Sequence, residues 1–274
     1  MKKLMLLAVL VLLALPLSAA VQYEFFQRSS SDDSAVPPAD LSARAVVDGT
    51  RTRVDFLSGN VYPPGTYMIS TDGSRRLFFV DPAKKWYTEV NAAGVASAIG
   101  SSNIKIENLQ TRVDRLPDSA TIAGVEADHY QTTITYDITV QPKAMPLKQH
   151  VRTVIDQWVT LKFGVTTGAV LHNSSRTGNA DIDRLIEAET DKVKGFAMRQ
   201  TVTITTMKEL APKESQLKLP RSRTLVREMV VTRISETEAN PTSFTIPATY
   251  RRAEVAEVPK GSNMQVLTME PAGK

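Results

Sequence analysis

The sequence predicts a β-rich α+β fold built on a single antiparallel sheet. Three observations support this: apolar and polar residues alternate over most of the chain, the segments between these runs are short and polar, and one long segment has helical periodicity. Alternation with a period of two is typical of strands that bury one face. Short connections favour antiparallel pairing of successive strands.

The clearest alternation is in QTTITYDITV, residues 131–140, where Ile134, Tyr136 and Ile138 share one face. The segment HVRTVIDQWVTLKF, residues 150–163, repeats the pattern, with Leu161 on its apolar face. Further strands are predicted over residues 21–28, 50–56, 65–70, 75–80, 85–90, 197–207 and 224–235. Residues 104–116 fit both a strand and a helix.

The segment NADIDRLIEAETDKVKGF predicts a helix over residues 180–194. Its apolar residues follow helical spacing, acidic residues occupy the first turn, and lysines occupy the last turn. This charge arrangement complements the helix dipole, and Gly195 is a natural stop. The small apolar residues 91–100 are a candidate for a short second helix, so one or two helices are expected.

The first twenty residues have the layout of a signal peptide: Lys2 and Lys3, an apolar run, and small residues that end at Ala20. The alternative is an uncleaved membrane anchor, which needs about 20 apolar residues. This apolar run is shorter and is interrupted by Pro16. We therefore expect cleavage after about Ala20 and a periplasmic location.

The expected mature chain, residues 21–274, has no cysteine, which excludes disulfides, thiolate metal sites and the acylated cysteine of a lipoprotein. It carries 31 basic and 29 acidic residues, too small a bias to favour nucleic acid. We expect a single domain with a mobile loop near 29–40, a proline-containing loop at 141–149 and a flexible C-terminal tail from about 253.

No catalytic constellation is evident in the sequence. The three histidines, His129, His150 and His172, lack the spacing of a helical zinc motif and are interpreted as ordinary solvated residues. No nucleophile, phosphate-binding or dinucleotide-binding motif occurs. We therefore expect no enzyme activity, no catalytic residue, no metal and no cofactor.

The stretch VDPAKKWYTEV, residues 80–90, predicts a hairpin. Asp81 followed by Pro82 favours a type I turn between two short strands. Trp86 then lies on the inner face, beside Phe79 or Phe78 across the hairpin, depending on the register.

Several motifs occur in an order that resembles the LolA, LolB and RseB superfamily of periplasmic proteins, most closely its uncharacterised exported branch. They are the strand around RTRVDF, the DPAKKWYTE hairpin, IAGVEADHY at 122–130, TTGAVLH at 166–172, and the closing PTSFTIPATY at 241–250. The resemblance implies a sheet curled into a half-barrel, with one or two helices on its concave side. It also implies a non-catalytic carrier that holds acyl chains in an apolar groove.

The expected ligand is therefore a lipid or the acyl chain of a lipoprotein, and contact with a membrane surface is compatible with this role. The candidate groove residues are the apolar residues expected on the inner face of the sheet: Phe56, Phe79, Trp86, Ile134, Tyr136, Ile138, Val202 and Ile204. The same residues could instead form a filled core beneath the helix. The chain would then be a protein-interaction or stress-sensing module of the envelope, without a ligand.

Overall fold

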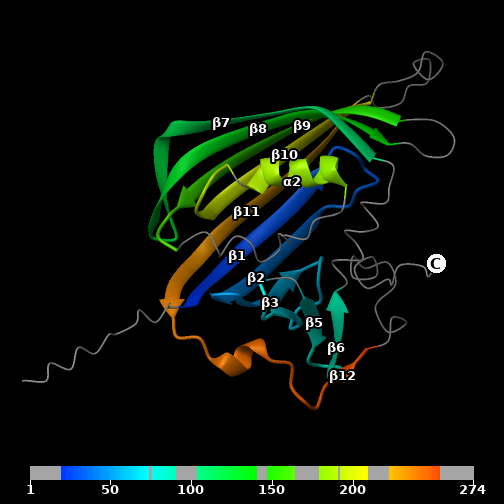
Figure 1. The fold of residues 1–274 in the computed structure, drawn as a ribbon. Coiled ribbons are helices and arrows are strands. Elements are labelled where there is room, and N and C mark those ends of the chain that lie inside the picture. The colour runs from blue at the N-terminus through cyan, green and yellow to red at the C-terminus, as the bar shows by residue number, and fades with distance from the viewer. Residues whose placement is uncertain are drawn as a thin grey trace, which may run out of the picture.

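The computed structural model describes residues 20–73, 76–90, 104–140, 147–163, 179–190, 192–208 and 222–253. These residues form one open sheet of twelve strands in the order β12-β6-β5-β4-β3-β2-β1-β11-β10-β9-β8-β7 (Figure 1). Neighbouring strands are antiparallel throughout, except that β12 runs parallel to β6.

The first six strands are β1 (Ala20–Ser31), β2 (Ala39–Asp48), β3 (Arg51–Gly59), β4 (Tyr67–Ser70), β5 (Leu77–Asp81) and β6 (Trp86–Val90). The others are β7 (Ile104–Ile122), β8 (Val125–Val140), β9 (Leu147–Thr160), β10 (Phe196–Lys208), β11 (Ser222–Thr237) and β12 (Arg251–Arg252). One α-helix, α2 (Ala180–Thr190), and one 3₁₀ helix, η3 (Pro241–Phe244), complete the described elements.

The sheet is strongly curved, and α2 lies on its concave side, under the arch formed by the long strands β7 to β10 (Figure 1). The predicted fold class, a curved antiparallel half-barrel with a helix on the concave side, is therefore confirmed. No helix in the described ranges has the length and apolar character that a membrane crossing requires.

The N-terminus of α2 is fixed to the edge strand β7. Asn179 caps the helix, because its Oδ1 atom accepts hydrogen bonds from the backbone N–H groups of Asp181 and Ile182 at 3.0 and 3.3 Å. The Asn179 amide donates to the Ile104 carbonyl at 3.1 Å, and Asp181 accepts from the Ile106 N–H at 3.1 Å. Together these bonds occupy backbone groups of β7 that would otherwise be unpaired.

The helix is shorter than predicted. It ends at Thr190, so Lys192 and Lys194 lie beyond it rather than in its last turn. The chain must turn here to enter β10, and Gly195 makes the turn with a φ of +127°. Gly195 therefore marks the entry into β10 rather than the end of the helix.

The strand β2 was not predicted from the sequence. Its buried residues alternate correctly, but two of the four are Ala43 and Ala45, which have low strand propensity. The predicted loop 29–40 is also shorter in the structure, since β1 continues to Ser31 and β2 begins at Ala39. Within this connection, Asp32 exchanges hydrogen bonds with the backbone of Thr224 on β11, at 2.8 and 3.1 Å.

The ambiguous segment 104–116 belongs to a strand, β7. Its pairing with β8 shifts between Glu107 and Gln110 and again between Arg115 and Ser119. Each irregularity interrupts the alternation of side chains. This interruption explains why the sequence pattern resembled helical spacing.

The predicted hairpin at Asp81–Pro82 is confirmed. Strands β5 and β6 pair with Asp81 opposite Trp86, and the Asp81 carboxylate accepts from the Lys84 N–H at 3.1 Å. Phe79, rather than Phe78, lies beside Trp86, with ring centroids 5.8 Å apart.

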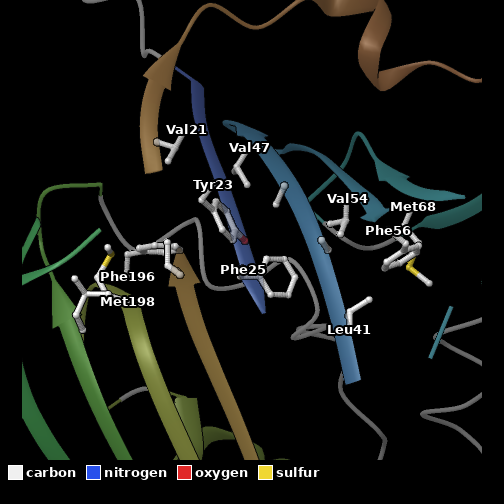
Figure 2. Packing of buried hydrophobic residues seen from close by; sticks show 14 of the residues in the cluster. Val21, Tyr23, Phe25, Leu41, Val47, Val54, Phe56, Met68, Phe196 and Met198 are labelled. Atoms are coloured by element: carbon white, nitrogen blue, oxygen red, sulfur yellow. The ribbon is translucent and has the colours of Figure 1, made fainter. Parts of the chain in front are cut away.

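Most buried apolar residues form one cluster that begins on β1, β2 and β3 and extends to Phe196 and Met198 at the start of β10 (Figure 2). A smaller cluster, Tyr67, Ile69 and Val80, lies on the opposite face of β4 and β5. The closing sequence motif covers this second face, because Ile246 and Tyr250 pack against it. The motif therefore stabilises the fold of the first half of the sheet.

Some expectations fall outside the described residues: the helix candidate at 91–100, His172, residues 141–146 of the predicted loop, and the tail beyond Ala253. Leu161 was expected to point inward at the end of its strand. It lies after β9 has ended at Thr160 and is 74% exposed.

Candidate functional site

The eight predicted groove residues separate into two groups. Phe56, Phe79 and Trp86 lie on β3, β5 and β6, and each is at most 3% exposed. Their rings are in contact with one another and with Tyr62, which stacks on Phe56 at 4.2 Å. The space around these three rings is therefore occupied by neighbouring side chains.

The second group lies on β8 and β10, on one face of the sheet. Ile134 pairs with Thr153 on β9, and Thr153 pairs with Ile204 on β10. Side chains at paired positions leave the same face of a sheet. Ile134 is fully buried, whereas the other members, Tyr136, Ile138, Val202 and Ile204, are half-buried.

The same face continues onto β11, because Ile204 pairs with Leu225 and Gln200 pairs with Met229. We use the name concave strip for the half-buried apolar residues of this face: Tyr136, Ile138, Val202, Ile204, Leu225 and Met229. The row that contains Ile138 also contains Ile106, which is 4% exposed although β7 is an edge strand, whereas Lys105 and Glu107 on the other face of β7 are exposed. Because α2 is bound to this part of β7, we infer that the covered face is the one on which α2 lies and that the strip belongs to it.

The helix does not bury its own apolar residues completely. Ile182, Leu185 and Ile186 are all half-buried. Apolar side chains thus remain partly exposed both on α2 and on the strands of the concave strip. An apolar ligand bound between α2 and the strip would bury these partly exposed side chains, and removing apolar surface from water is favourable.

A second feature, on the opposite face of β8 and β9, was not predicted from the sequence. His129 is held between two carboxylates: Asp118 on β7 lies 2.9 Å from its Nδ1 atom, and Asp156 on β9 lies 3.0 Å from its Nε2 atom. The histidine is 7% exposed, so its interpretation as an ordinary solvated residue was wrong. Among the described residues, His150 has one carboxylate partner, Asp137, and the histidine is exposed.

The two contacts determine the charge of His129. A neutral imidazole has one N–H group and can donate to only one carboxylate, whereas an imidazolium can donate to both. Burial lowers the pKa of His129, but the hydrogen bonds and charges of Asp118 and Asp156 outweigh this effect and raise it above its ordinary value. Protonation of His129 is therefore favoured, and the protonated ring can donate to carboxylates on both neighbouring strands, β7 and β9.

Trp158 completes this polar cluster. It is the cross-strand partner of His129, and the two rings stack with their centroids 4.0 Å apart and an angle of 11°. The Arg199 guanidinium lies 5.1 Å from the Trp158 centroid. Trp158 is half-buried and packs against the main core.

The His129 cluster is a structural charge network in this geometry. Both ring nitrogens face carboxylates, so neither is available to accept a proton from a substrate. Within the described ranges, no three side chains of the metal-binding types are arranged to hold a metal ion.

The fold thus defines an open antiparallel half-barrel with an incompletely buried concave face. No family model matches the sequence, and no curated protein matches it. Among solved structures, the chain is similar to an uncharacterised conserved protein from Thermus thermophilus, with 10% identity, a TM-score of 0.34, and coverage of 86% of this chain and 91% of that one. It is also similar to a LolA superfamily protein from Nitrosomonas europaea, with 9% identity, a TM-score of 0.32, and coverage of 83% and 90%.

Proposed function

We propose that this chain is a periplasmic, non-catalytic binding protein that holds a lipid, or the acyl chain of a lipoprotein, against the concave strip and α2. The observation that carries the proposal is the row of half-buried apolar residues on both sides of the concave space. An acyl chain placed there would gain about 0.8 kcal/mol for each methylene group that it buries. A dozen buried methylenes would contribute about 10 kcal/mol against an entropic cost of association of about 4–15 kcal/mol.

In this proposal Tyr136, Ile138, Val202 and Ile204 contact the ligand, and Ile134 supports them from below. Phe56, Phe79 and Trp86 have a different role. They belong to the packed core of the first half of the sheet.

Native mass spectrometry of the protein purified from its own envelope is the first test. A co-purifying lipid or acylated peptide is expected. Binding of a fatty acid should then weaken by at least about tenfold in Ile204→Asn, because a polar amide replaces apolar surface in the wall. Thr203→Asn, on the opposite face of the same strand, is the matched control and should bind as the wild type does.

If no lipid co-purifies and no fatty acid or acylated peptide binds, the carrier proposal fails. The protein would then be better described as an envelope interaction module. The closed packing of the Phe56, Phe79 and Trp86 group is the observation that favours this second candidate.

A further inference from the structure

We propose that the acyl chain held on the concave face carries a negatively charged head, a carboxylate or a phosphate, and that Arg227 binds this head. The inference rests on the proposed function and specifies the chemical class of its ligand. It depends on the position of Arg227, its lack of a carboxylate partner among the described residues and the chemistry of its neighbours.

Arg227 lies among the residues of the concave strip, on the same face of the sheet. It is the cross-strand partner of Val202 on β10 and of Ser29 on β1. Leu225 and Met229 are two residues away on either side along β11 and therefore leave the same face. The side chain of Arg227 is exposed, so its guanidinium is accessible on this face.

No acidic side chain of the described residues pairs with Arg227. The neighbouring positions on its face are apolar or neutral: Val202, Gln200, Gln27 and Ser29. The acidic residue next to it in sequence, Glu228, leaves the opposite face and is paired with Arg28 there.

Most other arginines in the described ranges have a carboxylate partner. On β1, β2 and β11 alone, Arg28 pairs with Glu228, Arg44 and Arg233 with Glu24, and Arg223 with Asp33. Compared with these paired arginines, a cation without a carboxylate partner on a mainly apolar surface is unusual. It supplies the charge that an anionic head would complement.

The guanidinium fork suits either head group. It presents planar N–H donors that match the two oxygens of a carboxylate or phosphate, and such charge-assisted bonds are stronger than neutral ones. The neighbouring apolar residues can accommodate the chain at the same time. Arg227 would therefore determine both the orientation of the ligand and its charge preference.

The test compares ligands with one chain and different heads: laurate, lauryl phosphate and lauryl alcohol, at neutral pH. The wild type should bind one or both anions about tenfold more tightly than the alcohol. Acetate and inorganic phosphate, which have a head without the chain, should not bind measurably. The relative affinities of laurate and lauryl phosphate distinguish a carboxylate head from a phosphate head.

Arg227→Met should remove the preference for the anions, so that the three lauryl compounds bind with similar affinity. The matched control is Arg152→Met, which removes the same charge from an exposed position on the opposite face of β9. The control should retain the preference. Circular dichroism and melting temperature should show that both variants are folded.

Three results would decide against the inference in different ways. If the wild type binds all three lauryl compounds equally, the charged head is wrong but the carrier function stands. If Arg227→Met retains the preference, or Arg152→Met loses it equally, Arg227 is not the anchor. If no lauryl compound binds at all, the proposed function itself fails.

Discussion

His129 shows how a single residue can link several strands through its charge. Neighbours on β7 and β9 provide the two carboxylates, and Trp158 covers the ring face. The pKa of His129 in the folded protein is raised above the value of about 6.5 for an unfolded chain. Its contribution to stability should therefore be fully present below about pH 6.5 and be lost as the pH rises through the folded pKa.

We predict that the free energy of unfolding falls as the pH rises above about 6.5 and through the raised pKa of His129, and that His129→Gln flattens this dependence. Glutamine donates from one amide group only and carries no charge, so it cannot replace both bonds. Denaturant unfolding at several pH values measures the slope. If wild type and variant have the same slope over this range, His129 is not a charged link.

The sequence could not reveal this cluster. Asp118, His129 and Asp156 come from three strands, and their proximity depends on the pairing register and on the irregularity between Arg115 and Ser119. Alternation places a side chain on a face but does not identify its cross-strand partners. The sequence contained one modest signal of this cluster, namely that Asp156 and Trp158 share one face of a strand.

At the scale of elements, the connection between α2 and β10 depends on close backbone contact. A Cβ atom at Gly195 would lie 2.6 Å from Val159 Cγ1 and 2.7 Å from the Thr160 carbonyl oxygen. The φ of +127° adds strain for any other residue. This glycine lets the chain pass directly over the end of β9.

We predict that Gly195→Ala lowers the free energy of unfolding by about 3 kcal/mol, from backbone strain and overpacking together. Gly49→Ala is the matched control, because Gly49 also has a positive φ, of +58°, but has no atom within 4 Å of the added Cβ. The control should cost about 1 kcal/mol. Equal losses in denaturant unfolding would show that contact with Val159 and Thr160 has no effect.

Elements with strong local signals were predicted and others were missed. The Asp81–Pro82 hairpin and α2 depend on turn and capping chemistry within a few residues, which the sequence displays. Strand β2 was missed because Ala43 and Ala45 give little contrast with their polar neighbours. Strand β7 was ambiguous because two irregularities shift its alternation.

At the scale of the whole molecule, the candidate site was predicted in part. The face shared by Ile134, Val202 and Ile204 follows from alternation in two strands that the sequence identifies clearly. The separation of these residues from Phe56, Phe79 and Trp86 could not be predicted from alternation, because it depends on how far apart β3 and β10 lie in the strand order.

Export remains a prediction that the intact protein can test. We expect the mature chain to begin near Val21, because the preceding residues have the layout of a signal peptide. N-terminal sequencing and intact mass of the periplasmic fraction measure this directly. A full-length product in the membrane fraction would contradict cleavage after about Ala20.

The strand order also has a consequence for the order of folding. Strand β1 is the first to be synthesised, yet one of its two neighbours, β11, is nearly the last, and the ion pair between Arg28 and Glu228 joins residues 200 positions apart. Closing so long a loop costs entropy before its contacts form, and pairings of this kind slow folding. One edge of β1 therefore stays unpaired until almost the entire chain has been made. A nascent chain of this topology remains incompletely folded during synthesis, which is the state in which a polypeptide can still be threaded through a narrow channel.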